Sequence, residues 1–172
     1  MNSNFDQSLQ LVLKSEGGFV NNPNDPGGMT NLGVTKAVWE AWVGHPVDEK
    51  AMRVLTPDDV APMYKRKYWE KSSCDALPSG IDYFVFDTAV NSGPGRAVKL
   101  LQACVKADVD GVIGPKTLAA VKACNQSDLI DDYSKYRLSF LSDLPTWSTF
   151  GKGWSNRVEQ VKQSALSMLT YS

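Results

Sequence analysis

Residues 81–91 have the sequence IDYFVFDTAVN, and this stretch decides the fold of the 172-residue chain. It follows a break at Leu77-Pro78-Ser79-Gly80 and precedes another at Gly93-Pro94-Gly95. Its side chains are apolar almost all round, and a helix of that kind is normally surrounded by other elements of the protein. We therefore predict a central helix over residues 81–91.

Helical spacing of apolar residues continues on both sides of this segment. Helix-starting residues stand at Thr35, Thr56-Pro57, Ser127 and Ser155. The predicted helices cover residues 4–15, 36–43, 57–71, 95–106, 115–124, 127–142 and 155–169, with connecting chain over 44–55. No segment alternates as a sustained strand does, so the fold class is mainly α. The glycines and prolines of 19–34 predict a loop or a short hairpin.

The composition indicates a folded globular protein, with 42% hydrophobic and 22% charged residues. The net charge is −1, so there is no general basicity that would favour nucleic acid as a partner. Residues 1–91 carry a charge of −4 and residues 92–172 a charge of +3. The second half therefore faces either an anionic polymer or only solvent.

The cysteines, Cys74, Cys104 and Cys124, are odd in number and include no close pair, which does not indicate a disulfide framework. With one histidine, a Cys–His zinc site has little support, and we predict neither a metal nor a cofactor. The N-terminus lacks the basic and apolar regions of a signal peptide, and no apolar run approaches the ~18 residues of a membrane span. We expect a chain made in the cytoplasm that does not insert into membranes.

A candidate acid, Glu16, precedes Gly17-Gly18 at the end of the first predicted helix. The negative end of the helix dipole disfavours a carboxylate there, and partial burial acts in the same direction, so both raise its pKa. A carboxyl with a raised pKa can act as a general acid near neutral pH. The alternative is a surface glutamate before a turn.

A second carboxyl, Asp25, stands in an Asp-Pro-Gly-Gly sequence, which is often a plain turn. Thr30 and Asn31 follow and add short hydrogen-bonding side chains. A carboxylate and a hydroxyl on one loop can hold a water against a sugar while an acid protonates the other face. Glu16, Asp25 and Thr30 are therefore candidate catalytic residues.

Three stretches resemble the glycoside hydrolase family 108 lysozymes, which are phage endolysins and related bacterial muramidases. They are Ser15 to Thr35, Tyr64 to Trp69 and Asp82 to Gly93. The resemblance implies a lysozyme-like helical fold and hydrolysis of the β-1,4 bond between N-acetylmuramic acid and N-acetylglucosamine, with Glu16 as the acid. Substrate contacts are predicted at Asn31, Tyr83 and Asn91, and for Tyr83 core packing is the alternative.

Two later stretches carry further resemblances. Residues 109–117, with Asp110-Gly111 and Gly114-Pro115, look like the core of peptidoglycan-binding modules. We expect a catalytic region over 1–92 and a peptidoglycan-binding-like region over 93–172, packed together because no long linker separates them. Whether the second region binds by itself stays open. Residues 153–158 resemble a late motif of phage-type lysozymes, which implies that Arg157 pairs with Glu16. The alternative is a surface arginine or a bridge to Glu159 or another acid, and Arg137 is a second candidate partner for Glu16.

The function predicted from the sequence is that of an endolysin-type muramidase acting on peptidoglycan. A lytic transglycosylase and a non-catalytic peptidoglycan-binding or secretion-assisting protein are the alternatives. Carboxyl groups about 5 Å apart would favour retention, and about 6.5–9.5 Å would favour inversion, which phage-type lysozymes suggest. We expect a monomer that reaches the cell wall after release, with a phage holin as helper.

Overall fold

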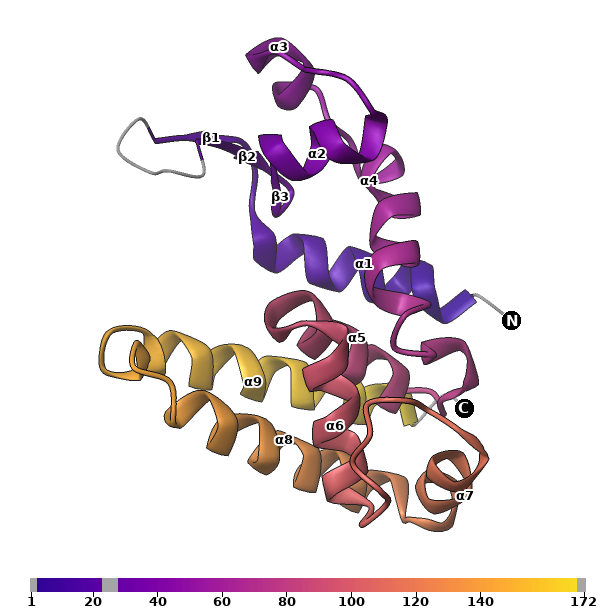
Figure 1. Cartoon of the computed structure of the whole chain (residues 1–172). Coiled ribbons are helices and arrows are strands. Elements are labelled where there is room, and N and C mark those ends of the chain that lie inside the picture. The colour runs from indigo at the N-terminus through magenta and orange to yellow at the C-terminus, as the bar shows by residue number, and fades with distance from the viewer. Residues whose placement is uncertain (1–2, 23–27, 170–172) are drawn as a thin grey trace. The chain divides into compact units, whose positions relative to one another are not determined.

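The computed structural model describes residues 3–22 and 28–169. Within them it contains nine α-helices and one three-stranded antiparallel sheet, so the predicted mainly α fold is confirmed (Figure 1). The chain forms two compact units. We call residues 5–66 the N-terminal unit, and residues 3–4 with 67–169 the C-terminal unit. This division by packing differs from the predicted division by sequence module at 92/93, which stays a prediction.

The N-terminal unit consists of helices around a small sheet. Its elements are α1 (Ser3–Glu16, which begins in the other unit), β1 (Val20–Asn21), β2 (Met29–Asn31), β3 (Val34–Thr35), α2 (Lys36–Val43), α3 (Glu49–Arg53) and α4 (Pro57–Tyr64). Strand β2 is central: Thr30 pairs with Val20 on one side and with Thr35 on the other. The described part of the segment that was predicted as a loop or short hairpin therefore contributes to a three-stranded sheet.

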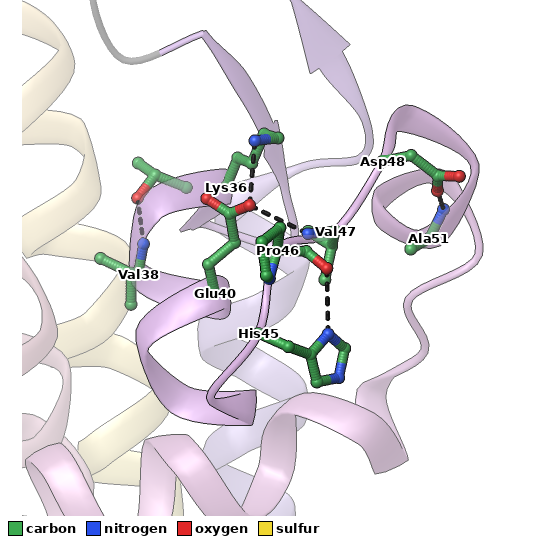
Figure 2. A network of polar contacts seen from close by, with 9 residues as sticks. Lys36, Val38, Glu40, His45, Pro46, Val47, Asp48 and Ala51 are labelled. Atoms are coloured by element: carbon green, nitrogen blue, oxygen red, sulfur yellow. Dashed lines mark hydrogen bonds and ion pairs between the residues drawn. The ribbon is translucent and has the colours of Figure 1, made fainter.

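Helix α2 begins and ends as the sequence predicts. The Thr35 hydroxyl accepts a hydrogen bond from the Val38 N–H at 3.2 Å, and Gly44 ends the helix at φ 84°. The following residues were predicted to be connecting chain, but they include α3. The Asp48 carboxylate caps α3 by accepting from the Ala51 N–H at 2.8 Å, a signal that the sequence prediction missed (Figure 2).

Glu40 stabilises the connection between α2 and α3, as Figure 2 shows. Its carboxylate accepts hydrogen bonds from the Val47 N–H at 2.9 Å and from Lys36 Nζ at 3.0 Å. The Val47 N–H, followed by Lys36, lowers the pKa of Glu40, because both favour the charged form. Glu40 is thus engaged in holding a loop.

Helix α4 has the predicted start and a different end. Thr56 and Asp59 form a reciprocal capping box, with the threonine hydroxyl 3.2 Å from the Asp59 N–H and the Asp59 carboxylate 2.9 Å from the Thr56 N–H. The helix was predicted to continue to residue 71. Instead a π-helical turn, Lys65–Trp69, replaces the last part, and the two units meet in sequence within it.

The C-terminal unit is a helical bundle centred on α5 (Ile81–Ser92). Every residue from Ile81 to Ala89 is buried, and α5 packs against α6, α8 and α9 (Figure 1). The predicted central helix is therefore confirmed. The remaining elements are a 3₁₀ turn (Cys74–Ala76), α6 (Pro94–Cys104), α7 (Pro115–Ala123), α8 (Gln126–Ser142) and α9 (Trp147–Leu169).

Two predicted helix starts in this unit are wrong. Helix α8 begins after Asn125, whose side chain accepts from the Asp128 N–H at 3.0 Å, and not at Ser127. Helix α9 begins at Trp147, so Ser155 lies in its interior. Gly151 lies inside the helix, and the Trp147 indole covers it so closely that a Cβ there would lie 2.7 Å from the ring. Packing has overridden helix propensity.

No helix among the described residues is long and apolar enough to cross a membrane. The three cysteines are free: Cys74 is buried, and Cys104 and Cys124 are half-buried.

Candidate active site

Glu16 is the last residue of α1, and its side chain is half-buried. Gly17 follows in the left-handed region at φ 81°, and its N–H bonds back to the Leu13 carbonyl at 3.4 Å. Glycine adopts this conformation without steric cost, which is why the helix ends here. The carboxyl of Glu16 is thus placed at the C-terminal end of a helix, partly shielded from water.

The turn between β2 and β3 is a two-residue turn formed by Leu32 and Gly33. Both have positive φ, 53° and 77°, which is the geometry of a type I′ hairpin turn. Leucine is a poor residue for this region, and such a conformation persists only where its surroundings hold it. The Tyr64 hydroxyl stabilises this conformation, because it donates a hydrogen bond to the Leu32 carbonyl at 2.7 Å.

The side chains of Glu16 and Tyr64 both lie close to Gly33. A Cβ on Gly33 would lie 2.7 Å from the Tyr64 hydroxyl oxygen and 2.9 Å from both Cγ and Oε2 of Glu16. The Glu16 carboxyl therefore lies directly against the turn. Gly33 itself is exposed, so this position is open to the surface. The sequence prediction did not assign Tyr64 and Gly33 to the site, although both stand within the stretches that resemble the family.

We expect Gly33→Ala to impair both stability and glycan cleavage, the activity that the sequence predicts. The new methyl must displace Glu16 or Tyr64, and alanine is strained at φ 77°. Gly44→Ala is the matched control, because Gly44 has φ 84° but no atom within 4 Å of a built Cβ. The control should lose about 1 kcal/mol of unfolding free energy and keep its activity. Gly33→Ala should lose about 2–3 kcal/mol, and its rate should fall at least about tenfold.

Equal losses of stability and full activity in both alanine variants would contradict this arrangement. Urea denaturation gives the stabilities, and the release of soluble fragments from purified peptidoglycan gives the rates.

The other predicted residues of the N-terminal unit have different positions. Thr30 is half-buried in the middle of β2, two residues before Leu32. Asn31 is buried, and its side-chain amide donates to the carbonyls of Met52 at 2.8 Å and Arg53 at 3.4 Å. Its amide group therefore ties β2 to the end of α3. Asp25 lies outside the described residues, so its catalytic role stays a prediction.

In the C-terminal unit, both predicted arginines bind one carboxylate, that of Asp87 on α5. Arg137 Nη1 donates to Asp87 Oδ2 and Arg157 Nη2 donates to Asp87 Oδ1, each at 2.7 Å. The side chains of Asp87 and Arg137 are 0% exposed, and that of Arg157 is 17% exposed. We call these three residues the Asp87 cluster. It contains two positive charges and one negative charge.

The predicted pairing of Glu16 with either arginine would join the two units, and it stays a prediction. Asp87 was not predicted as a functional residue. The available signal was a carboxylate in the middle of an otherwise apolar helix, because a buried charge requires a partner.

Tyr83 and Asn91, the predicted saccharide contacts on α5, have opposite environments. Tyr83 is buried one turn before Asp87, and burial, together with the Asp87 charge, raises the pKa of its hydroxyl. Asn91 is exposed in the last turn of the helix. Exposure leaves the Asn91 amide accessible, whereas the burial of Tyr83 favours a packing role.

Comparison with known proteins identifies the family of the chain. Residues 9–93 match the family described as Glycosyl hydrolase 108, and residues 96–159 match one described as Predicted Peptidoglycan domain. Among solved structures, Brucella abortus SagA is 43% identical in sequence, with a TM-score of 0.85 and a match that covers 98% of this chain and 97% of that one. No curated protein matches. The chain therefore belongs to the glycosyl hydrolase 108 family, with a peptidoglycan domain as its second part.

Proposed function

We propose that the protein is a muramidase that hydrolyses the β-1,4 bond between N-acetylmuramic acid and N-acetylglucosamine, with Glu16 as the proton donor. The observation that carries the proposal is the position of Glu16. Its carboxyl stands at the end of α1 and against the Leu32-Gly33 turn, in a chain of the glycosyl hydrolase 108 family. A general acid must hold a proton that it can give to the leaving oxygen, and a carboxyl group can supply one.

The proposed reaction breaks the bond between muramic C1 and the glycosidic oxygen. Glu16 gives its proton to that oxygen as the bond breaks, and a water adds to C1 and releases a proton to a base. Asp25, helped by the Thr30 hydroxyl, is the proposed group that orients this water or stabilises the positive charge on the sugar. Thr30 is suited to this because it lies on the strand that leads into the turn against Glu16.

The Leu32-Gly33 turn is the proposed positioning element of the acid. It is held by the Tyr64 hydroxyl, and the missing side chain at Gly33 leaves the space that the Glu16 carboxyl occupies. A general acid must be within hydrogen-bonding reach of its target oxygen, so a displacement of about 1 Å is costly.

The chemical identity of the new chain end tests this proposal. Digestion of purified peptidoglycan should produce fragments that end in reducing N-acetylmuramic acid, because hydrolysis adds one water across each cleaved bond. Mass spectrometry after borohydride reduction identifies that end. Anhydro-muramic ends would instead indicate a lytic transglycosylase, and reducing N-acetylglucosamine ends would indicate cleavage of the other glycosidic bond. Intact peptidoglycan would favour a binding or secretion-assisting protein. Each of these three outcomes would reject the proposal.

We propose an endolysin-type setting, in which the protein acts as a monomer on the wall after release, with a holin as helper. The resemblance to phage endolysins supports this. Lysis of permeabilised Gram-negative cells by the purified protein measures the lytic part of the proposal.

A further inference from the structure

A groove lies in the C-terminal unit beside the start of α7, within the residues matched by the peptidoglycan domain. Its volume is about 670 Å³. Ala107, Pro115 and Ala120 contribute small apolar surfaces to its wall, and Lys106, Asp108 and Lys116 contribute charges. The groove therefore offers small apolar surfaces together with charges of both signs.

The wall of the groove is held in place by one buried amide, Gln102 on α6. Its Nε2 donates to Asp110 Oδ1 and the Val112 carbonyl, both at 2.9 Å, and to Thr117 Oγ1 at 3.2 Å. Its Oε1 accepts from the N–H groups of Asp110 at 3.1 Å and Gly111 at 2.9 Å. A single side chain thus joins α6, the 110–112 loop and α7. A wall held this way is preorganised for a ligand.

The charged side chains that line the groove differ in whether neighbouring groups already bind them. Asp110 is already bound: the Val112 N–H and the Gln102 amide both donate hydrogen bonds to it and lower its pKa. Among the described residues, Lys106, Lys116 and Asp108 form no ion pair. Two cations and one anion of the groove are therefore available to a ligand.

We propose that this groove binds the peptide stem of peptidoglycan. A stem peptide carries free carboxylates, an amine on its diamino acid in many walls, and small alanine side chains. Lys106 and Lys116 bind the carboxylates, Asp108 binds the amine, and the small apolar wall residues contact the alanines. The inference rests on peptidoglycan being the polymer that the protein meets, and it does not depend on Glu16 being an acid.

The conformation of Lys106 provides a variant that separates binding from folding. Helix α6 ends in a Schellman motif, with Ala107 N–H bonded to the Gln102 carbonyl at 2.9 Å and Lys106 N–H bonded to the Ala103 carbonyl at 3.2 Å. Lys106 occupies the left-handed position of that motif at φ 58°, where glycine is preferred. Lys106→Gly should therefore weaken binding while its melting temperature stays at or above that of the parent.

The test measures binding of the full chain to purified sacculi in a Glu16→Gln background, so that the sacculi stay intact. Lys106→Glu/Lys116→Glu is the test variant. Lys71→Glu/Lys152→Glu is the matched control, with two exposed lysines that do not line the groove. Each protein is also measured on sacculi whose peptides an amidase has removed. We expect the test variant to bind intact sacculi about tenfold more weakly than the parent, as 1.4 kcal/mol implies.

The control should bind as the parent does, and Lys106→Gly should show part of the loss. On peptide-free sacculi, the difference between parent and test variant should disappear. Equal binding of test and control variants to intact sacculi would overturn the proposal. A difference that persists on peptide-free sacculi would also overturn it, because the groove would then bind glycan. A wild-type protein that fails to cleave glycan would reject the proposed function and leave this binding result unchanged.

Discussion

Asp87→Ala is expected to lower the free energy of unfolding by about 3–5 kcal/mol. The substitution leaves Arg137, which is 0% exposed, and Arg157, which is 17% exposed, without the carboxylate that binds both at 2.7 Å. The fully buried Arg137 guanidinium would then lie in a water-poor interior without its carboxylate, where such a charge is most costly. Urea denaturation monitored by circular dichroism measures the loss.

Asp131→Ala is the matched control for this prediction. Asp131 also binds two cations, Lys135 at 3.1 Å and Lys162 at 2.8 Å, but its side chain is 41% exposed. Water screens such a bridge, so the control should lose no more than about 1 kcal/mol. Arg137→Met should cost less than Asp87→Ala, because it leaves one charge of each sign in the Asp87 cluster. Similar losses for Asp87→Ala and Asp131→Ala would show that the buried cluster contributes no more than a surface bridge.

Glu16→Gln is expected to reduce the rate of glycan cleavage by about 10²–10⁴-fold, the usual contribution of a general acid. Glutamine has nearly the same shape, so it can occupy the space against Gly33, but it has no proton of suitable acidity to donate. Binding to peptidoglycan and the melting temperature should stay close to those of the wild type. Initial rates of fragment release from purified sacculi measure the effect.

Glu70→Gln is the control, because it makes the same change at an exposed glutamate that directly follows the π-helical turn. It should be as active as the wild type. A Glu16→Gln protein that retained more than about a tenth of the wild-type rate would argue against Glu16 as the acid. If Glu16→Gln lost activity and also had a lower melting temperature, the loss would indicate a structural role for Glu16.

The elements that could be predicted from the sequence are those set by local pattern. The all-round apolar sequence of 81–91 predicted the buried α5, and the threonines at 35 and 56 predicted two helix starts that the structure confirms. The start of α9 was missed because its first turns contain Gly151 and Gly153, which are poor helix formers, and the Trp147 indole packs against Gly151. The start of α3 was missed for a different reason. Its cap, Asp48, is present in the sequence, but the five-residue helix is too short to show a clear apolar periodicity.

The candidate site could be predicted only in part. Glu16 stands out in sequence because of the glycines that follow it and the family resemblance. Its surroundings depend on contacts distant in the chain: the Tyr64 hydroxyl bonds to the Leu32 carbonyl, and the space at Gly33 is shared with the acid. Asp87 likewise joins three helices through side chains of α8 and α9. No local periodicity encodes such contacts.

The most direct test of the central claim is the digestion of purified sacculi in water enriched in the heavy oxygen isotope. A muramidase that uses Glu16 as its acid should place the heavy oxygen on C1 of new N-acetylmuramic acid ends. Glu70→Gln should label those ends equally, and Glu16→Gln should leave almost none. Unlabelled anhydro ends, labelled N-acetylglucosamine ends, or equal labelling by Glu16→Gln would contradict the account.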